Sequence, residues 1–399
     1  MHKVVVGGAF DFALADWKKL RLSDLAQYHN GVAFKPADWV EDGLPIIRIE
    51  QLNNPDGEFD RYAGLVAENN RIRNGDLIFS WSATLKAIIW RHGDAVLNQH
   101  LFKVVPKPNI DIHFLHFVLD FNMEALGNGS HGSTMKHIKR SELDKFFVAV
   151  PSTVRQRKIA SILSTIDTAI EQTEALIEKY QHIKAGLMHD LFTRGVLPNG
   201  QLRPPREQAP ELYQETAIGW IPREWDDVSL GQIASFQRGH DIVETDFKEG
   251  LFPVVSSSGI IGYHSVATTK APNVVIGRKG TIGKVHFLET DFWAHDTSLF
   301  TTDFFYNDPR FVFHLCIRLE LSRFGTKSGS PSLNRNDIHP VRVGRPIKEE
   351  QIKIAKLLDI ATVKLDAERR KIVALKYQKL GLMQDLLTGK VAVTVEGGF

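Results

Sequence analysis

The sequence predicts an α+β fold in which two globular, strand-rich domains are separated by two long antiparallel coiled-coil helices, the whole being a pseudo-two-fold duplication. Three observations predict it: an octapeptide occurs twice, shorter matches recur at constant spacing, and each half ends in a long apolar pattern of helical period. The octapeptide copies lie 195 residues apart (381 minus 186). Solenoid repeats span only roughly 20 to 50 residues, so whole domains are duplicated here.

The repeat covers most of the chain. Gly-Leu-Met-His-Asp-Leu-Phe-Thr at 186–193 returns as Gly-Leu-Met-Gln-Asp-Leu-Leu-Thr at 381–388. A segment opened by Pro151 and Gln156 matches one opened by Pro346 and Gln351 at the same spacing. Farther upstream the spacing is 208 (225 minus 17), and it relates Trp17, Leu22, Ala26 and Gly31 to Trp225, Leu230, Ala234 and Gly239.

Composition indicates an ordinary globular protein of about two to three domains, with 399 residues, 43% hydrophobic and 24% charged. The single cysteine, Cys316, cannot form an internal disulfide, and no cysteine or histidine cluster has zinc-ligand spacing. The apolar N-terminus is interrupted by Gly7-Gly8 and Asp11, which argues against a signal peptide. No run of about 18 apolar residues predicts a membrane span. We expect a cytoplasmic protein without membrane contact.

Basic residues are concentrated in two places. The net charge is only +2, so a sequence-blind DNA coat is excluded. Lysine and arginine outnumber acidic residues within 136–158 and again within 318–345, which occupy the same part of each repeat. Either stretch alone is explained by a solvated charged face, but their recurrence favours a surface that binds a polyanion.

The globular part of each repeat combines short strands and helices. Residues 44–49, 76–81 and 273–277 are β-rich runs bounded by Gly, Asn and Pro, while 113–123 and 308–324 are predicted helices. Each repeat therefore begins with a compact α+β domain of roughly 130 to 150 residues.

The second part of each repeat predicts a long helix. Mostly apolar residues recur at alternating three- and four-residue steps from Ile159 to Asp190 and from Ile354 to Leu386. A surface helix of one domain is the alternative, but such helices average about 11 or 12 residues, whereas these patterns run about 35. Packed against each other, the helices form an antiparallel pair. The residues assigned to the interhelix seam or to partner docking are Ile159, Ile162, Ile166, Leu176, Leu187, Ile354, Leu358, Leu365, Leu375 and Leu382.

These patterns divide the chain into six parts. Residues 195–222 contain five prolines between Pro198 and Pro222 and are expected to connect the first helix to the second domain without an α-helix. The predicted parts are domain one at 1–150, a coiled-coil helix at 151–194, a linker at 195–222, domain two at 223–345, a second coiled-coil helix at 346–390 and a tail at 391–399.

Signatures of catalysis are absent. Residues 277–285 resemble a phosphate loop, yet they have five residues between Gly277 and Gly283 instead of four, and Val285 replaces the hydroxyl that binds Mg²⁺. Asn53-Asn54-Pro55-Asp56 lacks the Pro-Pro-aromatic core with which amino-methyltransferases hold a flipped base. No catalytic or metal-binding residue is assigned; an enzyme whose residues meet only in the fold stays open as an alternative.

Two strand-rich domains, each followed by a long helix ending in Gly-Leu-Met-x-Asp-Leu-x-Thr, resemble the specificity subunits of type I restriction-modification enzymes. The most specific matches are 211–225, 151–163 with 346–358, and the paired helix ends, while 132–143 and 329–338 resemble the turn that closes each domain. The first repeat departs from the family by lacking the Gly-Trp-Ile-Pro lead-in before Trp17.

The resemblance implies a non-catalytic DNA-recognition subunit of a prokaryotic cell. Each domain would read one half of a bipartite, asymmetric DNA target, and the helices would set the spacing and dock two methyltransferase subunits, which restriction and translocase subunits then join. No cofactor is expected on this chain; S-adenosylmethionine would belong to the methyltransferase partner, and ATP and Mg to the nuclease and translocase partner. A coiled-coil scaffold between proteins is the alternative.

Side chains that suit base edges and phosphates supply the candidate DNA contacts. Arg and Lys suit guanine, Asn suits adenine, and Lys or Ser on loops anchor phosphates. For any single residue, a solvated or turn position is the simpler interpretation. The candidates are Lys35, Arg48, Trp81, Lys86, Ser133, Lys136, His137 and Lys139 in the first domain, and Arg238, Arg278, Lys279, Lys284, Lys327, Ser330, Asn334 and Arg335 in the second.

Overall fold

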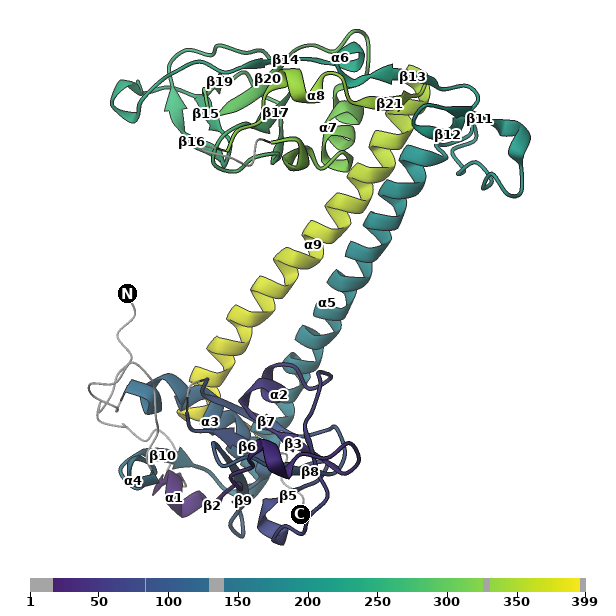
Figure 1. Cartoon of the computed structure of the whole chain (residues 1–399). Coiled ribbons are helices and arrows are strands. Elements are labelled where there is room, and N and C mark those ends of the chain that lie inside the picture. The colour runs from purple at the N-terminus through teal and green to yellow at the C-terminus, as the bar shows by residue number, and fades with distance from the viewer. Residues whose placement is uncertain (1–16, 83, 129–139, 326–330, 395–399) are drawn as a thin grey trace. The chain divides into compact units, whose positions relative to one another are not determined.

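The chain folds into two compact units, each of which takes its residues from both halves of the sequence. A computed structural model describes residues 17–82, 84–128, 140–325 and 331–394 (Figure 1). The first unit comprises Met1–Glu174 with Lys371–Phe399, and the second comprises Ala175–Arg370. Each unit therefore holds one globular domain, part of the first long helix and part of the second. Residues 1–16, which were predicted to be part of domain one, lie outside the described residues.

The domain of the first unit contains two four-stranded sheets. One has the order β2-β9-β6-β7 and is antiparallel throughout; the other has the order β4-β3-β8-β5, with β3 parallel to β8. Helix α3 packs against β7 and β9. The elements are β1 (Lys18–Arg21), α1 (Leu22–Leu25), β2 (Ala26–Asn30), η1 (Pro36–Asp38), β3 (Leu44–Ile47), α2 (Ile49–Asn53), β4 (Arg61–Tyr62), η2 (Glu68–Asn70), β5 (Arg71–Ile72), β6 (Leu77–Ser80), β7 (Lys86–Ile89), β8 (Ala95–Leu97), β9 (Leu101–Pro106), α3 (Ile112–Asn128), α4 (Arg140–Leu143) and β10 (Phe147–Val150).

The domain of the second unit repeats this arrangement. Its sheets have the orders β14-β20-β17-β18 and β16-β15-β19, and β15 runs parallel to β19 as β3 does to β8. The predicted duplication is therefore confirmed. The elements are η3 (Pro210–Leu212), β11 (Tyr213–Thr216), β12 (Gly219–Pro222), β13 (Asp226–Ser229), α6 (Leu230–Ile233), β14 (Ser235–Arg238), η4 (Glu244–Asp246), β15 (Phe252–Ser256), β16 (Gly259–His264), β17 (Asn273–Gly277), β18 (Val285–Leu288), β19 (Trp293–Ala294), β20 (Ser298–Asp303), α7 (Pro309–Arg318), η5 (Leu321–Phe324), α8 (Arg335–Ile338) and β21 (Arg342–Arg345).

One predicted helix is shorter than expected. The helix predicted at 308–324 begins where Asp308 caps it, because its side chain accepts a hydrogen bond from the Phe311 amide at 2.8 Å, and Pro309 fits the first turn. It ends at Arg318 because Glu320 adopts a left-handed backbone with φ of 48°. The residues that follow form the separate turn η5.

The repeated glycines Gly31 and Gly239 have the same role in both domains. A Cβ on Gly31 would lie 2.2 Å from the Leu97 carbonyl oxygen, and a Cβ on Gly239 would lie 2.2 Å from that of His295. Both glycines therefore let a loop pass directly over the turn that leads into the next strand of the sheet. Backbone approach explains why glycine recurs here at the constant spacing.

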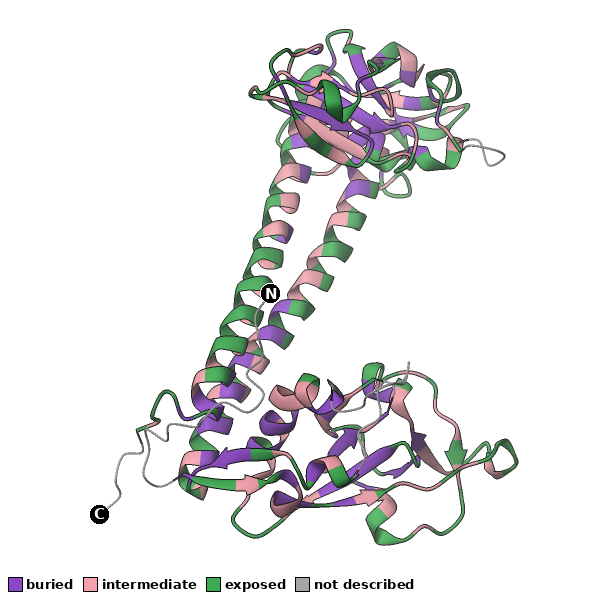
Figure 2. Cartoon of the chain, turned by 90° about the vertical axis from the view of Figure 1, so that its left-hand side faces the viewer, coloured by how far each residue is buried: buried purple, intermediate pink, exposed green. Residues whose placement is uncertain are grey.

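Two helices of about 40 residues follow the domains, as predicted. Helix α5 spans Thr153–Thr193 and α9 spans Lys348–Leu387. Of the ten seam residues, Ile159, Ile166, Ile354, Leu358 and Leu365 are buried, and the other five are half-buried. Buried positions recur along both helices, where the ribbon of Figure 2 alternates between buried and exposed colours. None of the helices in the described part of the chain is long and apolar enough to cross a lipid bilayer.

The repeated octapeptide closes each helix against the start of the other. In the first unit Met383 and Leu386 of α9 share a core with Ile159 of α5. In the second unit Met188 and Leu191 of α5 share a core with Ile354 of α9. Within each unit, then, the end of one helix packs beside the beginning of the other, which is an antiparallel arrangement.

The repeated Pro-x₄-Gln motif ties each long helix to its domain. The Gln156 carboxamide donates to the Pro151 carbonyl at 2.9 Å and accepts from the Asp111 amide at 2.8 Å. Gln351 makes the same two contacts with Pro346 and Asp308. Because both glutamines are about 1% exposed, these bonds have no competition from water. The motif thus fixes where α5 and α9 leave their domains.

Residues 195–222 connect α5 to the second domain and also contain regular secondary structure. They contain η3 and the hairpin of β11 and β12, which the prediction of a linker missed. Buried Arg203 forms an ion pair with buried Glu350 at the start of α9, and the Trp225 indole also donates to Glu350, at 3.1 Å. A charged pair of this kind cannot be read from a proline-rich sequence, since its partner lies 147 residues away.

Candidate nucleic-acid interface

Four loops of the second domain converge at one end of its main sheet. The Arg278 amide donates to the Thr297 carbonyl at 2.8 Å, and the Leu333 amide donates to the Arg278 carbonyl at 2.9 Å. The Thr281 amide lies 3.4 Å from the Ser257 hydroxyl, which accepts its hydrogen. These bonds join the loop 278–284 to residues 256–258, 295–297 and 333–335. We call this group of residues the second-domain loop cluster.

The loop 278–284 within this cluster is a tight hairpin connection. The Gly277 amide donates to the Lys284 carbonyl at 2.7 Å, and the Gly283 amide donates to the Gly277 carbonyl at 2.8 Å. Gly283 has a φ of +76°, and a Cβ there would lie 2.3 Å from the Ser322 amide nitrogen. A phosphate loop leads from a strand into a helix, whereas this one joins antiparallel β17 and β18.

Most of the second-domain candidates lie in or beside the loop cluster. Arg278 and Lys279 are half-buried in the hairpin connection, and Arg335 is exposed beside it. One guanidinium nitrogen of Arg278, Nη1, is buried without a hydrogen-bond partner among the described residues. A buried donor in this state is unusual in folded proteins, so Arg278 is suited to an acceptor that a ligand would supply.

The other second-domain candidates already have intramolecular contacts. Lys284 is exposed, and its ammonium group donates to the Ser258 carbonyl at 2.9 Å. Arg238 pairs with Asp296 at 2.7 Å. The Asn334 side chain caps α8 by accepting from the Asn336 amide at 3.0 Å. Lys327 and Ser330 lie outside the described residues.

Three of the four first-domain candidates that the structure describes already contact other residues of the chain. Arg48 forms an ion pair with Asp60 and lies over the Trp39 ring at 5.2 Å, and Lys86 donates to the Leu52 carbonyl at 2.6 Å. The Trp81 ring packs 5.9 Å from that of Phe102. Lys35 is exposed. Ser133, Lys136, His137 and Lys139 lie outside the described residues.

The two domains present different loops at the same place in the fold. Residues 81–85 join β6 to β7, and 278–284 join β17 to β18, so the two loops occupy equivalent positions. The first loop carries no charged residue, whereas the second carries Arg278, Lys279 and Lys284. The two domains therefore place uncharged and basic side chains, respectively, at equivalent positions of the fold.

Several polar residues in or beside the loop cluster were not predicted. His286 donates from Nε2 to the Ser257 carbonyl at 3.1 Å, and burial lowers the pKa of its imidazole. His295 Nδ1 accepts from the Thr297 amide at 3.2 Å. These polar groups meet only through the fold, although the run Ser256-Ser257-Ser258-Gly259 is a turn signal that could have marked the position. In the described part of the chain, no three His, Cys, Asp or Glu residues are grouped so as to hold a metal ion.

Comparison with known proteins identifies the class to which this duplicated fold belongs. The family model of the type I restriction modification DNA specificity domain matches residues 15–180 and again 222–377. The chain therefore belongs to this family. Each matched segment begins just before a repeated tryptophan, Trp17 or Trp225, and ends within a long helix, so the two matches follow the repeat.

Individual relatives match either nearly the whole chain or a part of it. The MjaVIII type I restriction enzyme specificity subunit of Methanocaldococcus jannaschii is 23% identical, over 95% of this chain and 93% of its own. The EcoBI specificity subunit of Escherichia coli is 24% identical over 59% of this chain and 51% of its own. The crystal structure of the type-I restriction-modification S subunit from M. genitalium shares the fold, with a TM-score of 0.63, 17% identity and coverage of 93% of this chain and 96% of its own.

Proposed function

We propose that this chain is the DNA-recognition subunit of a type I restriction-modification complex, in which each globular domain reads one half of a bipartite target. The observation that carries the proposal is the twice-matched specificity domain, laid out as two copies of one sheet arrangement. Two domains of one architecture suit two separated half-sites on a duplex. The chain is non-catalytic by itself in this proposal.

The difference between the two domains supports an asymmetric target. At the equivalent hairpin connections the second domain offers arginine and lysine, and the first offers Trp81 with small or hydroxyl-bearing residues. An arginine fork matches the O6 and N7 acceptors of guanine in the major groove, whereas uncharged loops match other base edges or backbone. Two different half-sites follow from these differences.

The long helices would set the spacing of the half-sites and dock two methyltransferase subunits, with restriction and translocase subunits joining the complex. A 40-residue helix extends for about 60 Å at 1.5 Å per residue. One duplex turn is roughly 34 to 36 Å, so helices of this length suit half-sites about a turn apart. S-adenosylmethionine would be bound by the methyltransferase, and ATP and Mg by the translocase.

Methylome sequencing tests the function directly. The chain is expressed in a restriction-deficient host with the methyltransferase encoded beside it, and modified adenines are mapped. We expect one bipartite, asymmetric motif with an unread gap, which disappears when this chain is omitted. Methyl transfer from S-adenosylmethionine by the purified chain alone would show an enzyme instead. Assembly with partners but no salt-sensitive, sequence-dependent duplex binding would show a protein scaffold.

A further inference from the structure

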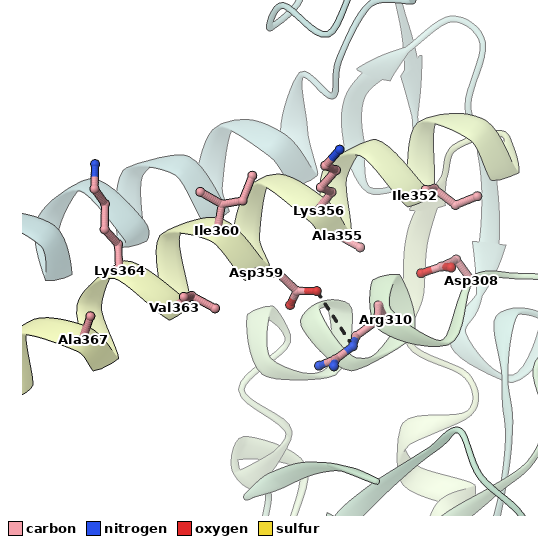
Figure 3. A pocket seen from close by; sticks show the side chains of 10 residues that line it. All are labelled: Asp308, Arg310, Ile352, Ala355, Lys356, Asp359, Ile360, Val363, Lys364 and Ala367. Carbon is pink, nitrogen blue, oxygen red and sulfur yellow. Dashed lines mark ion pairs between the residues drawn. The ribbon is translucent and has the colours of Figure 1, made fainter. Parts of the chain in front are cut away.

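A groove of about 620 Å³ lies on the second unit, where the start of α7 meets the outer side of α9. Its apolar lining comes chiefly from Ile352, Ile360 and Val363 of α9, and Figure 3 shows Asp359 and Arg310 approaching each other across it. A second groove of about 580 Å³ shares Asp308 and Arg310 with it and continues beside β18. Together they offer an elongated surface rather than a closed pocket for a small molecule.

The apolar side chains of this groove are exposed. Ile352 is 47% exposed, Ile360 is 55% and Val363 is 65%. Single exposed apolar residues are common on protein surfaces, but several on one helical strip beside a hollow mark an interaction site. The groove therefore suits the apolar face of a partner helix, which buries such a strip at helical spacing.

The uncompensated charge around the groove is positive. Lys356 and Lys364 line it without an ion pair to any described residue, and the Lys364 ammonium group lies 5.5 Å from the centre of the Tyr180 ring. The two acidic residues are already engaged: Asp308 caps α7, and Asp359 accepts from His314 at 2.8 Å and lies 3.8 Å from Arg310. A partner helix that carries acidic residues beside its apolar face would match this pattern.

The first helix does not repeat the groove's chemistry. The residues 195 positions before Ile352, Ile360 and Val363 are Arg157, Thr165 and Thr168, all exposed on α5. The internal repeat thus holds for the buried seam but not for this outer face. Two copies of one partner would meet an apolar surface on one helix and a polar one on the other.

We propose that this α9 groove is the tighter of the two docking sites for the methyltransferase subunits and takes an acidic, amphipathic helix of that partner. The inference rests on the proposed function and deepens it. One methyltransferase binds first at α9, and the second binds more weakly at α5. A second copy of this chain fits less well, because a symmetric dimer would bring Lys356 and Lys364 against their own counterparts.

The test is a titration of the full-length chain with the methyltransferase encoded beside it, followed by native mass spectrometry. The wild-type chain should accumulate a complex with one methyltransferase subunit before the complex with two. The double variant Ile360→Asp with Val363→Asp should weaken the tight step at least about 30-fold, since two buried apolar contacts are lost and charges are added. The matched variant Thr165→Asp with Thr168→Asp should leave that step unchanged.

A second variant guards against misfolding. Lys356→Glu with Lys364→Glu reverses two exposed charges, removes the contact of Lys364 with the Tyr180 ring, and should weaken the same step, more strongly at low salt. Equal affinities of the two wild-type sites, or an unchanged tight step in both groove variants, would overturn the inference. So would a homodimer of the wild-type chain that the groove variants dissociate.

These outcomes are distinct from failure of the proposed function. If the wild-type chain binds two methyltransferase subunits equally and directs methylation of a bipartite motif, only the inference fails. If it binds no methyltransferase and directs no methylation, the proposed function itself fails.

Discussion

Single residues carry the proposed base reading, and the second-domain loop cluster provides half of the described candidates. Arg278 stands out because its backbone is fixed by two hydrogen bonds while its Nη1 lacks a partner among the described residues. A donor that is held in place but unpaired is pre-organised for an acceptor on a base or a phosphate. Arg238 and Lys284, by contrast, would have to exchange existing partners.

Replacing Arg278 with Ala should relax the methylated motif at one position of a single half-site, because a bidentate contact to guanine contributes about 1 to 3 kcal/mol of discrimination. Motif mapping by methylome sequencing measures the effect. Arg206→Ala, an exposed arginine outside the loop cluster, is the control and should leave the motif intact. Uniform weakening at all positions would instead assign Arg278 to a phosphate.

Burial of the His314 imidazole makes the stability of the fold sensitive to acid. Burial lowers the pKa of His314 below its ordinary value of 6.5, although Asp359 beside it acts in the opposite direction. The unfolded chain therefore binds more protons than the folded chain as pH falls below about 6.5. Stability contributed by neutral His314 is complete above that pH and is lost as pH falls toward the folded pKa.

His314→Gln should consequently flatten the decline of melting temperature below about pH 6.5, measured by calorimetry across a pH series. His182→Gln, which changes an exposed histidine of α5, serves as the reference. A pH profile identical to that of the wild-type chain would show that His314 has no part in acid sensitivity.

At the scale of elements, periodicity predicted the helices better than any other feature. Steps of three and four residues located α5 and α9, because a buried seam leaves a regular apolar pattern. The fold within 195–222 was missed because Arg203 and Glu350 meet only after the chain has folded. The ion pairs of Lys379 on α9 were missed for the same reason. Its ammonium group pairs with Asp167 of α5 at 2.8 Å and with Asp120 of α3 at 3.5 Å.

The seam itself is testable at Ile166, which is 6% exposed on α5. Ile166→Asp should lower the free energy of unfolding by at least about 3 kcal/mol, because an unpaired carboxylate would be desolvated in place of an apolar side chain. Denaturant unfolding followed by circular dichroism gives the value. Ser161→Asp, exposed on the same helix, should cost about 0.5 kcal/mol or less; equal effects at the two sites would contradict a buried seam.

For the whole molecule, duplication was visible in the sequence, but the base-reading surface was not. Trp17 and Trp225 mark equivalent starts because they pack in equivalent cores. Loops such as 81–85 and 278–284 differ in length and charge, so no internal comparison could supply their contacts. The candidates remain predictions for that physical reason.

Exchange of one whole domain is the corresponding prediction at this scale. Replacing residues 223–345 with the matching segment of a relative should change one half of the methylated motif and leave the other half and the gap unchanged, as read by methylome sequencing. Exchange of the first domain provides the reciprocal control. A change in both halves at once would show that the domains do not read independently.

Each long helix ends beside the tryptophan that begins the other repeat. Gly389, just after α9, lies where a Cβ would be 3.4 Å from the Trp17 ring, and Gly195, just after α5, lies against Trp225. Each domain is therefore completed by the helix end of the other repeat. A polypeptide with a single repeat would lack that piece, and two such polypeptides could supply it to each other. Such a pair would have identical loops and, under the proposed function, would select a palindromic sequence, so covalent joining of the repeats would permit a target with two unlike halves.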